Sequence, residues 1–113
     1  MDFCIVVTTT DTDESARRIA HAALDARLAA CVQLFPIRSL YSWRGELRDE
    51  AEIFVQMKAR VEDYDLLAEA IRAVHGYEVP EILRIDVADG DKAYLDWVAL
   101  ATARDGSGPL RRA

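Results

Sequence analysis

Apolar and polar positions recur along this chain with two different periods, and the changes of period divide it into strands and helices. Residues 3–9 form an apolar, β-branched run without alternation, which is typical of a strand buried on both faces. Residues 13–29 carry apolar side chains at helical spacing, and Asp11 with Glu14 three positions later fits the start of a helix. The pattern therefore predicts a central strand followed by an amphipathic helix.

The middle of the chain has the pattern of a hairpin. Residues 31–38 are extended, but Pro36 lacks the N–H that a ladder needs, which favours an edge strand or a bulge. The extended pattern continues through Trp43 to a turn signal at residues 44–46, and residues 52–60 return as a third strand. We expect a long hairpin with its first strand at the edge of a sheet.

The remaining pattern predicts two more helices and one more strand. Residues 62–75 form a second amphipathic helix, the segment 76–80 breaks it before Pro80, and residues 81–87 alternate as a strand. Asp91 then looks like the cap of a third helix. The order βαββαβ plus a helix is the α+β, ferredoxin-like split βαβ arrangement, with an antiparallel sheet in the spatial order 4-1-3-2 and helices on one face.

This arrangement leaves one sheet face and one sheet edge without cover. The predicted edge strand is rich in apolar side chains and carries little protective charge. Self-association is the simplest way to cover both surfaces.

Composition fits one folded domain. The chain has 113 residues, of which 51% are hydrophobic and 30% are charged, so we expect a single domain over residues 1–104 and a flexible tail over 105–113. A net charge of -6 without a basic cluster argues against nucleic acid. Apolar runs are too short for a transmembrane segment or a secretory signal, and Cys4 and Cys31 suit buried thiols, so we expect a cytoplasmic protein without a disulfide.

Few residues support catalysis. The serines have no histidine in a motif-like context, the cysteines lack basic neighbours, and the glycines are scattered, so the sequence favours neither a nucleophilic enzyme nor a phosphate-binding loop. We expect no enzyme activity. The carboxylates Glu46, Asp49, Glu50 and Glu52 are interpreted as solvated guards of the hairpin rather than as a cation site.

His75 is the histidine with a chemical context. It ends the second predicted helix and leads into Tyr77, Glu78 and Glu81, so either helix capping or a binding role fits it. Cys31 is either a small core residue or a ligand, and a thiolate with an imidazole suits copper. One chain has too few such residues for a closed four-ligand zinc site, although symmetry can supply more.

Several blocks together resemble the CutA family of divalent-cation tolerance proteins. The most specific are Leu28-Ala29-Ala30-Cys31 and His75-Gly76-Tyr77-Glu78-Val79-Pro80-Glu81. Weaker matches are Val7-Thr8-Thr9, Ser39-Leu40-Tyr41-Ser42-Trp43-Arg44-Gly45, Lys58 and Ala93-Tyr94-Leu95-Asp96-Trp97. The resemblance implies a ferredoxin-like subunit similar to PII signalling proteins, assembled as a homotrimer by pairing of the hairpin strands between neighbours.

The same resemblance implies a cytosolic protein of copper and divalent-metal tolerance without an established reaction. Cys31 and His75 stand at its candidate copper-ligand positions. Two departures are Gly76, where the family usually has proline, and Thr8, where some members have a further cysteine.

Two hypotheses follow. In the first, the protein is a metal-binding trimer in which Trp43 lies at the hairpin contact and Tyr77, Glu78 and Glu81 shape a cleft between subunits. In the second, it is a PII-like signalling or interaction module that binds a partner protein or a small metabolite, such as an anion held by Lys58 and arginines.

Overall fold

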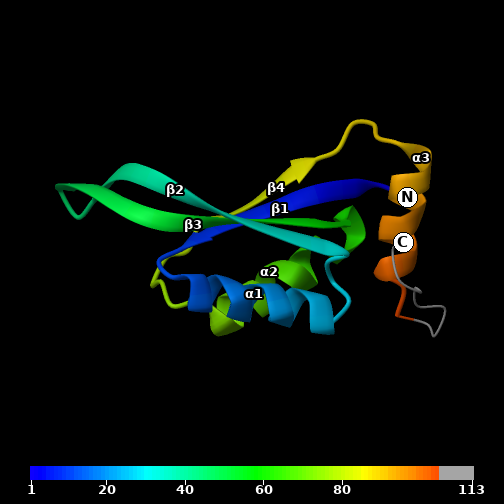
Figure 1. Ribbon diagram of the computed structural model, residues 1–113, viewed down its shortest axis with the longest axis horizontal. Coiled ribbons are helices and arrows are strands. Elements are labelled where there is room, and N and C mark those ends of the chain that lie inside the picture. The colour runs from blue at the N-terminus through cyan, green and yellow to red at the C-terminus, as the bar shows by residue number, and fades with distance from the viewer. Residues whose placement is uncertain (105–113) are drawn as a thin grey trace.

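The computed structural model describes residues 1–104, which form a four-stranded antiparallel sheet and three α-helices (Figure 1). The elements are β1 (Phe3–Thr10), α1 (Asp13–Asp25), β2 (Cys31–Trp43), β3 (Glu46–Arg60), a 3-10 turn (Val61–Asp63), α2 (Tyr64–Val74), β4 (Ile82–Asp86) and α3 (Lys92–Ala101). The strand order β2-β3-β1-β4 confirms the predicted α+β fold and the edge position of β2. The tail predicted at residues 105–113 lies outside the described residues.

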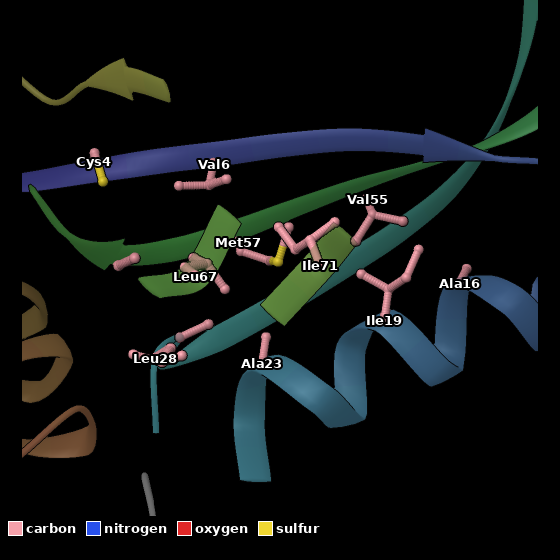
Figure 2. Close-up of a cluster of buried hydrophobic side chains, with 12 residues drawn as sticks. Cys4, Val6, Ala16, Ile19, Ala23, Leu28, Val55, Met57, Leu67 and Ile71 are labelled. Carbon is pink, nitrogen blue, oxygen red and sulfur yellow. The ribbon is translucent and has the colours of Figure 1, made fainter. Parts of the chain in front are cut away.

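The core lies between the sheet and the two helices α1 and α2, which cover the same face (Figures 1 and 2). Alternate residues of β1 and β3, such as Val6 and Met57, point into this layer and are fully buried. Ile19 of α1 and Ile71 of α2 meet them from the helix side. Helical and strand periods therefore direct their apolar side chains into one core.

Helix α1 begins at Asp13 as predicted, but its cap residue and its end differ from the prediction. Its N-cap is Thr12, whose Oγ1 accepts a hydrogen bond from the Ser15 N–H at 3.0 Å, so the prediction of Asp11 as the cap was wrong. The helix ends at Asp25 and not at residue 29, because Arg27 adopts a left-handed φ of 55°. The Leu28 N–H then bonds to the Ala23 carbonyl, which closes the helix as a Schellman motif without its usual glycine.

The hairpin is longer than predicted because β3 begins at Glu46 rather than at residue 52. Arg44 and Gly45 turn the chain with φ angles of 52° and 79°, as a two-residue type I′ hairpin turn requires. Residues 37–43 pair with residues 46–52, whereas β1 pairs with β3 only from Ile53 onward. We call residues 37–43 and 46–52 the arm, which projects past the helices (Figure 1).

Helix α3 stands at the opposite end of the sheet from the arm (Figure 1). Asp91 caps it by accepting a hydrogen bond from the Tyr94 N–H at 3.0 Å, as predicted. The buried carboxylate of Asp63 accepts hydrogen bonds from both terminal nitrogens of Arg104, at 3.0 and 2.6 Å. Arg60 also contacts Asp63 and donates to the Thr102 carbonyl, so these charges fasten the end of the described chain to the turn before α2.

Every helix among residues 1–104 is too short or too polar to span a lipid bilayer.

Candidate functional site

His75 lies directly after α2 and is held against the end of β1. Its Nε2 is 2.8 Å from the Thr9 carbonyl oxygen and 3.2 Å from Thr8 Oγ1. Its Nδ1 accepts a hydrogen bond from the Tyr77 N–H at 3.1 Å. Because the Tyr77 amide must donate to Nδ1, the Nε2 atom carries the proton and donates to Thr9. His75 therefore joins the helix end, β1 and the following loop, residues 75–81.

Cys31 begins β2 and lies on the other side of the sheet. The next residue, Val32, packs against the core, so the Cys31 side chain points to the face away from α1 and α2. Its register partner is Lys58, whose Nζ donates to Gln33 Oε1. Cys31 is a free, half-buried thiol.

One chain does not bring Cys31 and His75 together. Cys31 aligns with Lys58 and, one strand further, with Ile5, whereas His75 contacts β1 at Thr9. Strand and residue spacings place these two points about 16 Å apart. Within residues 1–104, no group of three or more histidine, cysteine, aspartate or glutamate side chains is arranged to hold a metal ion. A copper site that uses either residue needs a further ligand from another copy or from solvent.

Glu52 differs from the other carboxylates of the hairpin. Its relative exposure is 6%, so interpreting it as a solvated guard was wrong. The Tyr77 hydroxyl donates to Glu52 Oε2 at 2.6 Å, which ties the loop 75–81 to the base of the arm. Two effects raise the pKa of Tyr77 far above its ordinary value. Burial of the side chain is the larger, and the hydrogen bond to Glu52 is the second.

A groove of about 840 Å³ runs from this contact along the arm. It is lined by Tyr41 and Trp43 of β2, Glu50 and Glu52 of β3, and residues of the loop 75–81. Trp43, Tyr77, Glu78 and Glu81 border this groove of one chain, whereas Lys58 does not, and the cleft expected between subunits stays a prediction. Arg44, which is not part of the lining, pairs with Glu78 at 2.8 Å and lies over the Trp43 ring.

The charges of the groove favour a cationic ligand over an anion. Asp11, Glu50, Glu52, Glu78 and Glu81 outnumber the two lining arginines, Arg38 and Arg48. Arg38 already pairs with Asp49 at 2.7 Å. Lys58 lies outside this groove and the arginines there face carboxylates, so the anion hypothesis, which concerns a cleft between subunits, stays a prediction.

Comparison with known proteins places the chain in a family. The sequence profile described as CutA1 divalent ion tolerance protein matches residues 4–101. The chain belongs to the CutA1 family. It is 39% identical over 95 residues to the divalent-cation tolerance protein CutA of Thermus thermophilus, a match that covers 83% of this chain and 92% of that protein. Against the human protein CutA, identity is 37% over 83% of this chain but only 53% of the human protein.

Solved CutA structures share the fold. The periplasmic divalent cation tolerance protein CutA of Archaeoglobus fulgidus superposes with a TM-score of 0.87 at 33% identity, covering 89% of this chain and 99% of that one. CutA1 of Oryza sativa gives a TM-score of 0.87 at 32% identity, covering 94% and 97%. The names of the Thermus thermophilus and Archaeoglobus fulgidus proteins describe tolerance of divalent cations and no catalysed reaction.

The contact between buried Glu52 and half-buried Tyr77 was missed by sequence reasoning. Glu52 stands in a strongly charged stretch that has the composition of a solvated hairpin. A signal was available in the loop, because a tyrosine that follows a helix-ending histidine needs a hydroxyl partner once it is buried. The CutA resemblance drew attention to Tyr77 but not to its partner.

Proposed function

We propose that this protein is a cytosolic homotrimer of divalent metal ion tolerance that binds copper through His75, with Cys31 as a separate, assembly-dependent ligand. Membership of the CutA1 family carries the metal part of this proposal. The thiols of Cys4 and Cys31 are both free, which suits the reducing cytosol.

The arm supports self-association. A two-stranded ribbon alone is only marginally stable in water, yet the arm carries the exposed apolar side chains Leu40 and Leu47. Phe35 stacks on Phe54 at the base of the hairpin with ring centroids 5.0 Å apart, but it is still exposed to solvent. A second and third copy laid along β2 would cover these groups.

Copper at His75 must displace one of two hydrogen bonds, because both ring nitrogens are engaged. Loss of the bond to Tyr77 is the easier change, since it moves a loop, whereas loss of the bond to Thr9 disturbs a central strand. Copper then binds Nδ1. Since one imidazole is a weak site, a neighbouring copy supplies further ligands.

The test measures copper affinity and assembly mass for the wild type, His75→Ala and Cys31→Ser. His75→Ala should weaken binding of Cu(II), and Cys31→Ser should weaken binding of Cu(I), while all three stay trimeric by light scattering. Affinity should also fall between about pH 7.5 and pH 5.5, because protons compete for these ligands. Equal affinities without pH dependence in trimeric proteins would overturn the ligand assignment.

The other side of the imidazole gives a second check. Thr8 Oγ1 lies 3.2 Å from His75 Nε2, so Thr8→Cys places a thiol on the side of the ring opposite the proposed copper. We expect copper affinity to change by less than about twofold, whereas a rise of about tenfold would assign the copper to Nε2. Thr8→Ser, which keeps the hydroxyl, is the matched control and should leave the affinity unchanged.

A further inference from the structure

Glu52 is a buried carboxylate without a positive partner in the described chain. The only hydrogen bond that it accepts within residues 1–104 comes from the neutral Tyr77 hydroxyl, at 2.6 Å. Among these residues, no lysine, arginine or histidine lies within ion-pair distance of it. Glu52 is therefore a carboxylate whose charge would be compensated by a positive group that enters from outside the chain.

Glu52 faces a space that can admit such a group. It lines the groove of about 840 Å³, together with the rings of Tyr41, Trp43 and Tyr77. The Tyr41 hydroxyl is turned toward Glu50, to which it donates at 2.9 Å. Aromatic rings therefore border a carboxylate that lacks a counter-charge.

This lining suits an organic cation better than a divalent metal ion. A divalent ion needs several ligating groups, and residues 1–104 contain no cluster of three. A guanidinium or an ammonium needs one carboxylate for a charge-assisted hydrogen bond and aromatic faces for cation–π contacts. The groove offers both.

We propose that this groove binds a guanidinium or primary ammonium group, with Glu52 as its carboxylate and Tyr41, Trp43 and Tyr77 as its aromatic walls. The site uses neither Cys31 nor His75 as a ligand, but it shares the loop 75–81 with the copper proposal, because Tyr77 also bonds to His75 Nδ1. The cation comes either from a small molecule or from an arginine or lysine side chain of a second copy of this chain.

The experiment titrates the full chain with methylguanidinium and n-butylammonium by calorimetry. Methylurea, which has almost the same shape as methylguanidinium without its charge, is the matched probe. Glu52→Gln removes the charge, and Glu69→Gln removes an exposed charge of α2 that does not line the groove. We expect both cations to bind the wild type and Glu69→Gln alike, about tenfold weaker binding to Glu52→Gln, and no binding of methylurea.

A cation supplied by a second copy of the chain would give a different experimental result from a small-molecule cation. If a neighbouring copy fills the groove, free cations bind poorly, and Glu52→Gln assemblies dissociate at protein concentrations about tenfold higher than assemblies of the wild type and of Glu69→Gln. Sedimentation of a dilution series measures this dissociation. The proposal is overturned if Glu52→Gln, folded by circular dichroism, matches the wild type in both measurements, or if Glu69→Gln has the same effect.

Tyr77→Phe tests the proposal even if Glu52→Gln fails to fold. It keeps the aromatic ring but removes the only hydrogen-bond donor to Glu52 among residues 1–104. The uncompensated carboxylate then depends more on the incoming cation, so affinity, or assembly strength, should increase. A decrease would show that the Tyr77–Glu52 contact only shapes the loop and would contradict the proposal.

Discussion

The helix-covered half of the sheet and the arm are stabilised in opposite ways. Under α1 and α2, side chains such as Ile71 and Met57 are almost fully buried, and the carboxylate of Asp63 is buried with its arginines. Along the arm, Leu40 and Leu47 are 64% and 77% exposed. The comparison indicates that the covered half folds on its own core, whereas the arm depends on whatever packs against it.

The largest effect should come from truncating the covered core. Ile71→Ala removes a side chain that is 1% exposed between α2 and the sheet, and we expect a loss of about 2–5 kcal/mol in the free energy of unfolding. Leu66→Ala, on the same helix but 53% exposed, should cost less than about 1 kcal/mol. Urea unfolding measures both. Equal losses would mean that the outer face of α2 is also covered.

The buried and exposed ion pairs give the next contrast. Asp63→Asn leaves the charges of Arg104 and Arg60 without their carboxylate, and we expect a loss of about 2–3 kcal/mol, reduced because Arg104 is 37% exposed. Asp49→Asn breaks the arm's pair with Arg38, in which both side chains are largely solvated, and should cost less than about 1 kcal/mol. Thermal unfolding of both variants measures the two losses of stability. A larger loss from Asp49→Asn would reverse the comparison.

The covered half was more predictable from sequence than the arm. Val6, Ile19 and Ile71 belong to clear strand and helix periods, so element order and strand order followed from them. The end of α1 was missed because Arg27, rather than glycine, takes the left-handed position. The first half of β3 was missed because its charged residues at positions 46–52 do not alternate, since no core lies beneath them.

The candidate site was predictable by residue but not by geometry. His75, Tyr77 and Glu78 stand in one contiguous block, so sequence could group them. The contact of Tyr77 with Glu52 joins positions 25 residues apart, and it depends on where the loop crosses the arm. The separation of Cys31 from His75 depends on strand register, which a single sequence does not specify.

Alkaline pH should weaken the covered half through Cys4. Burial is the main cause that raises the pKa of this thiol from 9.0 to about 11. Because the folded state keeps the proton longer than the unfolded chain, this contribution to stability is fully present below pH 9 and is lost as pH rises toward about 11. The stability of Cys4→Ala, measured by urea unfolding, should therefore fall less steeply across this window. Parallel curves would contradict the assignment.

The smallest effect concerns the tip of the arm. Arg44 takes a φ of 52°, which asparagine adopts more readily, and Asn-Gly is the preferred pair for this turn. Arg44→Asn also removes an ion pair with Glu78 in which both side chains are about 70% exposed, and such pairs contribute little. We expect a gain of less than about 1 kcal/mol in the free energy of unfolding. Glu78→Gln, which breaks the pair without changing the turn, is the matched control. Arg44→Asn contradicts the expectation if it lowers the melting temperature by more than Glu78→Gln does. In that case the contact of the Arg44 guanidinium with the Trp43 ring stabilises the tip more than the strained turn destabilises it. The arm would then have a local source of stability, contrary to the difference drawn between the two regions.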